Sequence, residues 1–162
     1  MITIDKAKLN DINEIEEVYK YARKLMKETG NPNQWKDNHP SYEQLEEFVN
    51  KDELYIVKYD NKVCASFACA LGKDKTYETI EGSWLDNSDY VTIHALASNQ
   101  KIKGVFELVL NYIQINYKHI RIDTHKDNKI MQHLILKNGF KYCGIIHVLD
   151  GSPRFAYEKV LI

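Results

Sequence analysis

Two lysines and a glycine before a helix-like segment are the first residues whose spacing points to chemistry. In ASNQKIKGVFELVLNYIQ, Lys101, Lys103 and Gly104 directly precede an amphipathic pattern. Free amides and the partial positive charge at a helix N-terminus stabilise an anion by about 0.3 to 1 kcal/mol, and two ammonium groups strengthen the attraction. Glycine at 104 lets a phosphate approach the backbone. A plain turn is the alternative interpretation, since glycine is common before helices.

A histidine in a neighbouring strand-like segment is the first candidate for proton transfer. Residues 90–97 alternate so that one face carries Tyr90, Thr92, His94 and Leu96 and the other carries Val91, Ile93 and Ala95. Histidine titrates near neutral pH, so His94 suits a general base, with Tyr90 as its partner or as an acid. The alternative is a histidine that is hydrogen-bonded within the sheet for packing alone.

A second histidine competes for this role. His125 lies in THKDN, just after the strand-like residues 119–124, and the sites of α/β proteins gather at the carboxyl ends of strands. Alternatively, His125 only orients Asp123 or Asp127. No metal site is expected, because the histidines lack the i, i+4 spacing of a helical ligand pair and no carboxylate completes a site.

The order of the elements predicts a mixed sheet with helices on both faces. A strand at 1–4 precedes a helix from Asn10 or Asp11 to near Gly30, and Ser41 caps a second helix to about Asn50. Residues 54–72 form a hairpin that turns at 60–61, and 79–85 give no clear pattern. A strand at 90–97 and a helix at 103–117 follow. Residues 119–144 then contain a strand, a helix capped by Asp127 or Asn128, and a second strand, and a last strand lies at 154–160.

Size, charge and cysteine use restrict the class of protein. The 162 residues fit one domain with a full hydrophobic core, and a net charge of −1 gives no global attraction to nucleic acid or to an anionic membrane. No segment is typical of a signal peptide or a transmembrane helix. Three cysteines in apolar strands, without a CxxC pair, indicate buried free thiols and a cytoplasmic protein: Cys64, Cys69 and Cys143.

The chain resembles the GNAT-type N-acetyltransferases. Its KIKGVF segment is similar to the family's [RQ]xxGx[GA] loop, and an asparagine, a helix and a GF pair follow the next strand, here Asn128 and Gly139-Phe140. The resemblance covers nearly the whole chain, residues 1–162. It is greatest to a bacterial subgroup with the segments GNPNQW, RIDTHxDN, MQ, NGFxYCG and DGSPRxAY, all present here.

This resemblance implies a GNAT fold: an α/β (α+β) protein with a mixed, mostly antiparallel central sheet, splayed middle strands and helices on both faces. It implies direct transfer of an acetyl group from acetyl-CoA to a primary amine of a small molecule or peptide, with His94 or a water chain as the base. A second copy in a homodimer is compatible with it. The residues implied in acetyl-CoA binding are Leu96 (backbone amide), Lys101, Ile102, Lys103, Gly104, Val105, Phe106 and Asn128 (pantetheine arm).

Two tryptophans are candidates for the acceptor pocket. Trp35 and Trp84 both lie in polar, irregular segments, so each is expected to form a wall of this pocket. The alternative is a lid that packs over the core.

Several positions depart from the family pattern. Lys101 replaces arginine or glutamine, Phe106 replaces a small residue and is expected to crowd the pyrophosphate, and Ile135 replaces the tyrosine that protonates the leaving thiolate. His94-Ala95 replaces a His-Arg pair. The alternative function is therefore a non-catalytic descendant that binds CoA or a partner protein. A flavodoxin-like nucleotide binder is disfavoured, because the early hairpin and the last strand would be surplus to a parallel sheet.

Overall fold

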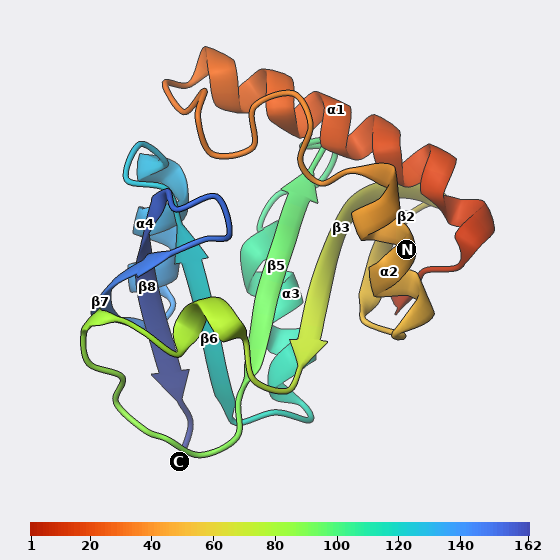
Figure 1. Ribbon diagram of the computed structural model, residues 1–162. Helices are drawn as coiled ribbons and strands as arrows, with labels where there is room; N and C mark the ends of the chain where they lie inside the picture. Colours follow the sequence, from red (N-terminus) through yellow and green to blue (C-terminus); the bar gives the residue numbers. More distant parts are fainter.

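The computed structural model describes residues 1–162 and contains one mixed eight-stranded sheet (Figure 1). The strand order is β1-β2-β3-β5-β6-β8-β7-β4, and every neighbouring pair is antiparallel except β5 and β6. The strands are β1 (Ile2–Lys6), β2 (Leu54–Tyr59), β3 (Lys62–Leu71), β4 (Glu81–Gly82), β5 (Val91–Ser98), β6 (His119–Thr124), β7 (Lys141–His147) and β8 (Pro153–Val160). The predicted mixed, mostly antiparallel sheet is confirmed.

Helices cover both faces of this sheet, as predicted. They are α1 (Ile12–Glu28), α2 (Tyr42–Asn50), α3 (Val105–Gln114) and α4 (Lys129–Lys137). Helices α1 and α2 pack with the side chains of one face into one apolar cluster, whereas α3 and α4 contribute to the cluster on the opposite face. None of the helices combines the length and the apolar character needed to span a bilayer.

Local sequence signals set several boundaries. Ser41 accepts a hydrogen bond from the Gln44 amide, and the Gln44 side chain accepts one from the Ser41 amide, so the predicted cap of α2 is a capping box. Asp60 and Asn61 adopt φ values of 50° and 68°, the left-handed pair that a tight two-residue hairpin requires. The three cysteines are buried and free, as expected.

The two parallel strands separate after a short ladder. Pairing of β5 with β6 runs only from Val91↔Ile120 to Ile93↔Ile122, although both strands continue. Figure 1 shows β5 and β6 diverging toward the segment that links α1 to α2. The predicted splay is confirmed, and backbone and side chains beyond the third pair face an opening in the sheet.

A β-bulge interrupts β5 within this opening. His94 pairs with Ala68 and Ala97 with Ser66, so Ala95 and Leu96 together oppose one residue of β3. Ala95 has a φ of 52°, and its carbonyl accepts a hydrogen bond from the Tyr19 hydroxyl at 2.6 Å. The predicted alternation is therefore wrong beyond His94. Leu96 packs in the cluster under α3, whereas Ala95 packs in the cluster under α1.

The segment between β3 and β5 crosses the sheet on the α1 side. It contains a 3₁₀ turn at Lys75–Tyr77 and the two-residue strand β4, which pairs with β7. Gly82 and Gly144 meet at this pair: a Cβ on Gly82 would lie 2.2 Å from the Cys143 oxygen, and one on Gly144 would lie 2.2 Å from the Glu81 oxygen. Both positions must be glycine for the two backbones to approach this closely.

Candidate active site

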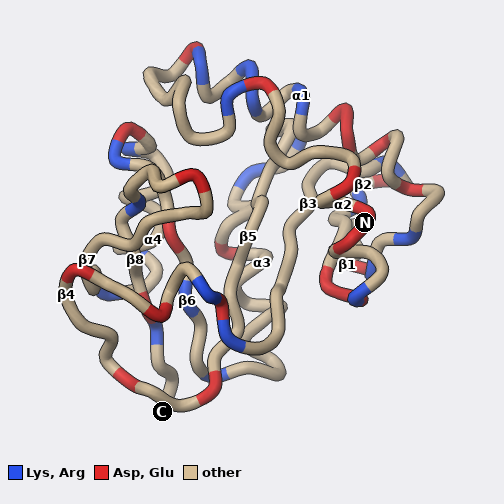
Figure 2. The backbone as a smooth tube through the Cα atoms, viewed as in Figure 1, with Lys and Arg blue, Asp and Glu red and all other residues tan.

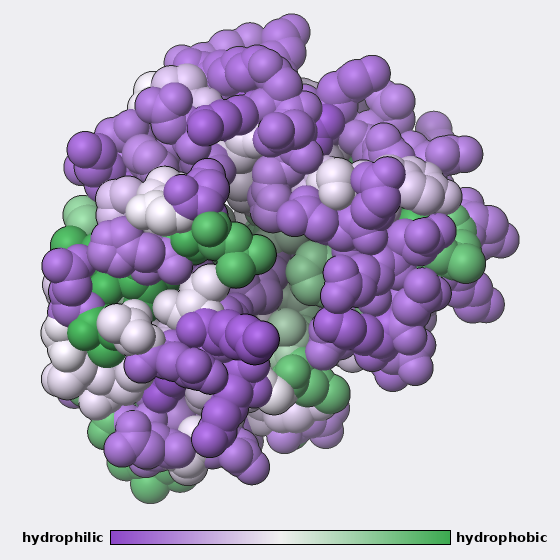
Figure 3. Space-filling model, viewed as in Figure 1, coloured by the Kyte–Doolittle hydropathy of each residue, from purple (hydrophilic) through white to green (hydrophobic).

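The opening between β5 and β6 places a histidine opposite a carboxylate. Because Ile93 and Ile122 form the last pair of the ladder and pack under α3, the next residues, His94 and Asp123, project from the opposite face. Figure 3 shows this face hollowed over the two strands, beside the segment that follows α1. Strand β5 carries no lysine, arginine, aspartate or glutamate, so these charges come only from neighbouring elements (Figure 2).

His94 is held by a carboxylate from the crossing segment. Its Nε2 lies 2.9 Å from Asp74 Oδ2, and the half-buried ring stacks on Phe48 at 6.4 Å. Since Nε2–H donates to Asp74, the lone pair of the neutral ring is on Nδ1, which has no partner in the structure. Burial lowers the pKa of His94, but the Asp74 hydrogen bond and the charges of Asp123 and Glu53 outweigh it and raise the pKa above its ordinary value.

Asp74 is a fixed anion. Burial raises its pKa, but hydrogen bonds from His94 and from the Thr76 hydroxyl and amide lower it to about 2. The Tyr90 hydroxyl accepts a hydrogen bond from the Asp74 amide at 2.8 Å. Tyr90, which was predicted as a partner or acid, therefore contacts the backbone of the histidine's partner rather than His94 itself.

Asp123 completes the polar wall on β6. Its Oδ2 accepts a hydrogen bond from the fully buried Tyr77 hydroxyl at 2.6 Å. Burial and the neighbouring Asp74 raise the pKa of Asp123, although His94, Tyr77 and Arg154 oppose that shift. The pKa of Tyr77 is raised by burial and by Asp123, so its hydroxyl keeps its proton. The site thus contains two carboxylates and one histidine with displaced pKa values, a pattern common in catalytic sites.

The segment after α1 closes one end of the opening. Gln34 Oε1 accepts hydrogen bonds from Asn31 and Asn128 side chains, both at 2.9 Å, and the Gln34 carbonyl accepts one from Arg154 at 3.1 Å. Asn128 also caps α4 by accepting from the Met131 amide at 3.0 Å. The residue predicted to contact a pantetheine arm thus already joins α4 to the segment over the site.

His125 is bound differently from His94. Its Nδ1 accepts a hydrogen bond from the Asp127 amide at 3.0 Å, so the neutral ring carries its proton on Nε2. Burial and the charge of Arg154 lower its pKa. A ring in this tautomer has no free lone pair for a second proton. The geometry favours its alternative role, organising the loop after β6.

The predicted anion loop has the expected shape. Ser98 Oγ accepts from the Gln100 amide and Asn99 Oδ1 from the Lys101 amide, at 3.0 and 3.1 Å, and Gly104 caps α3 with a φ of 71°. The first amide of α3 that bonds back is that of Leu108, to the Gly104 oxygen, so the three preceding amides are free. A Cβ on Gly104 would meet nothing within 4 Å. Lys101 and Lys103 are exposed beside this open space.

Phe106 does not occupy that space. Its ring is 4% exposed and packs edge to face on Phe140, with centroids 6.3 Å apart, in the cluster under α3. The expected crowding of a pyrophosphate by Phe106 is therefore wrong, because the helix directs the ring into the core.

The two tryptophans lie apart from each other. Trp35 is 7% exposed and packs edge to face on Tyr19 in the core under α1, which fits the lid interpretation. Trp84 donates from Nε1 to the Tyr77 carbonyl at 2.9 Å and covers the guanidinium of Arg121 at 3.9 Å. Neither ring lies against His94; Trp84 supports the segment that carries Tyr77.

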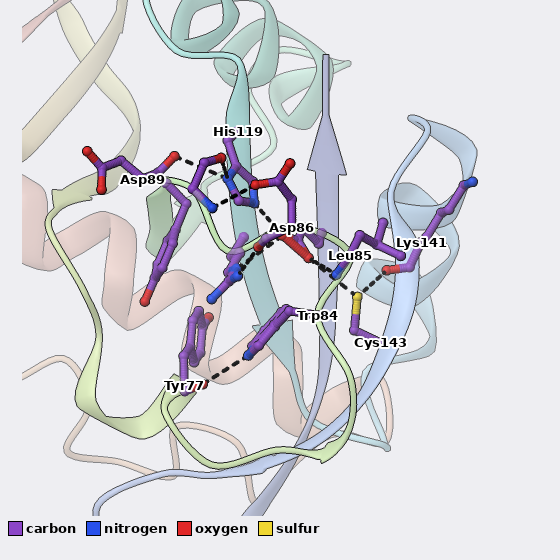
Figure 4. A network of polar contacts seen from close by, with 12 residues as sticks. Tyr77, Trp84, Leu85, Asp86, Asp89, His119, Lys141 and Cys143 are labelled. Atoms are coloured by element: carbon purple, nitrogen blue, oxygen red, sulfur yellow. Dashed lines mark hydrogen bonds and ion pairs between the residues drawn. The ribbon is translucent and has the colours of Figure 1, made fainter. Parts of the chain in front are cut away.

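A second polar network anchors the other end of this segment (Figure 4). Glu158, which is fully buried, binds His119 Nε2 and Arg121 Nε and accepts from the Leu85 amide at 2.8 Å. Arg121 donates to the Asp86 carbonyl at 2.8 Å and lies between the rings of Trp84 and Tyr90. This network fixes one end of the segment between β3 and β5, and the other end of that segment supplies Asp74 and Tyr77.

The sequence alone did not identify Asp74, Tyr77 or Arg154 as parts of the site. Asp74 and Tyr77 precede the histidine by 20 and 17 positions in a segment without clear periodicity. Asp123 was considered only as a partner of His125. The shared face of His94 and Asp123 was accessible in principle, because each is a polar residue that follows isoleucine in one of two strands expected to separate.

Comparisons with known proteins agree with this geometry. A scan of protein-family models and a search of curated proteins found no match. Among solved structures, a GNAT-family acetyltransferase from Streptococcus agalactiae 2603 is 29% identical, with a TM-score of 0.87 over 99% of this chain and 96% of that one. A protein from Staphylococcus aureus MU50, provisionally described as an acetyltransferase, is 25% identical, with a TM-score of 0.72 and 99% of both chains covered.

A more distant match defines the fold only. A GNAT-family acetyltransferase from Bacillus cereus ATCC 10987 is 18% identical, with a TM-score of 0.65 over 100% of this chain and 99% of that one. The chain thus shares a mixed α/β fold with a splayed sheet with these proteins. Its structural relatives are GNAT-family acetyltransferases, which confirms the resemblance predicted from the sequence and supports an acetyltransferase of the GNAT type.

Proposed function

We propose that this protein is an acetyl-CoA-dependent N-acetyltransferase that acts on a primary amine by direct transfer. The observation that carries the proposal is the placement of His94 and Asp123 on one face of the sheet, each one residue beyond the last β5–β6 pair, with Asp74 holding the histidine. A general base near neutral pH and a facing carboxylate are what an ammonium acceptor needs to bind and lose a proton. Similarity to GNAT acetyltransferases supports the class of reaction.

The residues at the start of α3 fit the pyrophosphate of acetyl-CoA. Three free amides, a left-handed Gly104 with open space before it and exposed Lys101 and Lys103 provide donors and positive charge. The co-substrate supplies an activated thioester. The bulge in β5 is suited to donate a hydrogen bond to the carbonyl oxygen of this thioester. Because the Ala95 oxygen points to Tyr19 and the peptide is trans, the Leu96 N–H points away from α1.

His94 and Asp123 then act on the acceptor. Asp123 attracts the ammonium form, and Nδ1 of His94 accepts one of its protons, which leaves a neutral amine. The nitrogen lone pair then bonds to the acetyl carbon as the carbon–sulfur bond breaks, and the nitrogen releases its second proton to water. Asp74 stabilises the resulting imidazolium. Ile135 is fully buried and carries no proton, so water protonates the leaving thiolate.

Transfer is tested by measuring CoA thiol released from acetyl-CoA with a panel of amino acids, polyamines, aminoglycosides and peptides. At least one amine is expected to be acetylated. If none reacts while calorimetry shows that CoA binds, the non-catalytic alternative replaces this proposal.

The cofactor site has its own matched test. In Gly104→Asp a carboxylate beside the free amides repels phosphate, and CoA affinity should fall at least tenfold. Gly104→Asn is the control, because asparagine has nearly the same size and tolerates positive φ without adding charge. If Gly104→Asp and Gly104→Asn bind CoA with equal affinity, the pyrophosphate lies elsewhere.

A further inference from the structure

Arg154 is a buried cation that forms no ion pair. The side chain is 7% exposed, and its partners are the Pro153 carbonyl at 2.9 Å, the Gln34 carbonyl at 3.1 Å and the Ser152 hydroxyl at 3.3 Å. No carboxylate lies within ion-pair distance. Arg121, buried to a similar degree, is paired with Glu158. Asp123 and Asp150 act on the guanidinium only from beyond ion-pair distance. A buried charge is costly unless an opposite charge contacts it, so the guanidinium is arranged for direct contact with an anion that the chain does not supply.

Arg154 shares the face of the proposed active site. In the β6–β8 ladder Asp123 pairs with Ala156, and partners in an antiparallel pair project from the same face. Arg154 precedes Ala156 by two positions and therefore projects from that face as well. Its charge helps to oppose the rise in the pKa of Asp123, and it adds to the effect of burial in lowering the pKa values of His39 and His125, so it acts on the site from the carboxyl end of β6.

The guanidinium has spare hydrogen-bonding capacity. It carries five N–H groups, and three hydrogen bonds are present, which leaves two donors. A planar guanidinium matches a carboxylate or a phosphate, because two parallel N–H groups meet two oxygens of the anion, and the carboxylate is the smaller of the two.

We infer that the acceptor is an amino acid, with its amine between His94 and Asp123 and its carboxylate on Arg154. This inference rests on the proposed function and adds the substrate class. The cationic and anionic ends of one small molecule then meet an acidic and a basic side chain that share one face. A simple amine fills only the acidic half.

The test compares each amino acid with the amine left when its carboxylate is removed. Methionine with 3-(methylthio)propylamine, phenylalanine with phenethylamine, and 4-aminobutyrate with propylamine cover different side chains and spacings. For at least one pair, kcat/KM should favour the carboxylate by roughly 10- to 100-fold, the usual contribution of a buried charged hydrogen bond. Aminophosphonates form a further arm, and a preference for them over carboxylates would overturn the assignment of the anion.

Arg154→Gln should abolish that preference, so that kcat/KM on the amino acid falls by roughly the full 10- to 100-fold relative to kcat/KM on the matched simple amine. Arg154→Lys should retain part of it, because the charge stays and the fork is lost. Lys126→Gln, the same charge change at an exposed position after β6, should leave the preference intact. If Arg154→Gln lowers both rates equally, the arginine only ties Gln34 to β8 and the inference is wrong.

Direct binding separates this inference from the proposed function. Calorimetry of the CoA-loaded protein should detect the amino acid, but not its simple amine, and Arg154→Gln should lose that binding. Acetylation of amines without any effect of the carboxylate refutes only the substrate class. Carboxylate-dependent binding without acetylation refutes only the proposed acetyltransferase activity.

Discussion

Two of the histidine–carboxylate pairs in the molecule have contrasting surroundings. His94 and Asp74 lie at the opening of the sheet, where 30% of the histidine side chain is exposed and Nδ1 is free. His119 and Glu158 lie in the core, where 6% and 0% are exposed and every polar group has a protein partner. The two pairs contain the same functional groups, but only the His94 ring keeps a free lone pair, which the proposed proton transfer requires.

The core pair also supports the open pair. The crossing segment is attached at Leu85 and Asp86 to Glu158 and Arg121, and its earlier residues supply Asp74 and Tyr77. We therefore expect damage to the core pair to appear mainly as lost stability, and damage to the open pair as lost rate.

The largest expected effect comes from Glu158→Gln. Removing this charge leaves Arg121 buried and unpaired, so the free energy of unfolding should fall by about 3 to 5 kcal/mol in urea denaturation. Glu78→Gln, an exposed position of the same crossing segment, should change it by less than about 0.5 kcal/mol. A loss as small as that of the control would mean that the core pair does not stabilise the fold.

His94→Gln should give the converse result. The rate of acetyl transfer should fall by roughly 10²-fold or more, because no base replaces Nδ1, while CoA affinity and unfolding free energy change little. His119→Gln is the matched variant, and it should lower stability more than it lowers the rate of the folded protein. Full activity in His94→Gln would transfer the role to water.

Asp74→Asn should produce a smaller change that appears in the pH profile. The carboxylate raises the pKa of His94, and only the neutral ring accepts a proton, so activity rises as pH passes that pKa. Without the charge the pKa falls, and the acid limb of kcat/KM should move to lower pH, with a plateau about tenfold lower from poorer positioning. If the acid limb of kcat/KM does not move, a group other than His94 controls it.

Tyr77→Phe should have the smallest effect. It removes one buried hydrogen bond to Asp123 and is expected to cost about 1 to 2 kcal/mol of stability, with CoA affinity unchanged. Because the hydroxyl helps to hold the pKa of Asp123 down, that pKa should rise further. Amine binding should then weaken at the acidic end of the profile, which NMR titration of the Asp123 carboxyl would verify.

Local signals made much of the fold predictable. Ser41, Asn128 and the 60–61 turn act within a few residues of their own position, and the short ladder between β5 and β6 follows from the family resemblance. The predicted face of Leu96 was wrong because a bulge adds one residue to β5, and no local pattern announces Ala95 in a left-handed conformation. Phe106 was misjudged because its ring packs on Phe140, which lies 34 positions later.

The site was less predictable because its contacts join distant segments. His94 could be nominated from its strand alone, but its partner comes from the aperiodic segment before β5, and Arg154 approaches from the last strand. Alternation places a side chain on a face without identifying the segment that crosses above it. The identity of these partners therefore required the tertiary structure.

The close approach of Gly82 and Gly144 has a consequence for mutational tolerance. Each position excludes every side chain, since a single carbon on either glycine would overlap the backbone of the other strand. A saturation scan should therefore show two intolerant positions outside the proposed active site, although Glu81, directly before Gly82, is exposed and should tolerate substitution. Such positions are easily mistaken for functional ones, although here they only allow β4 of the crossing segment to pair closely with β7.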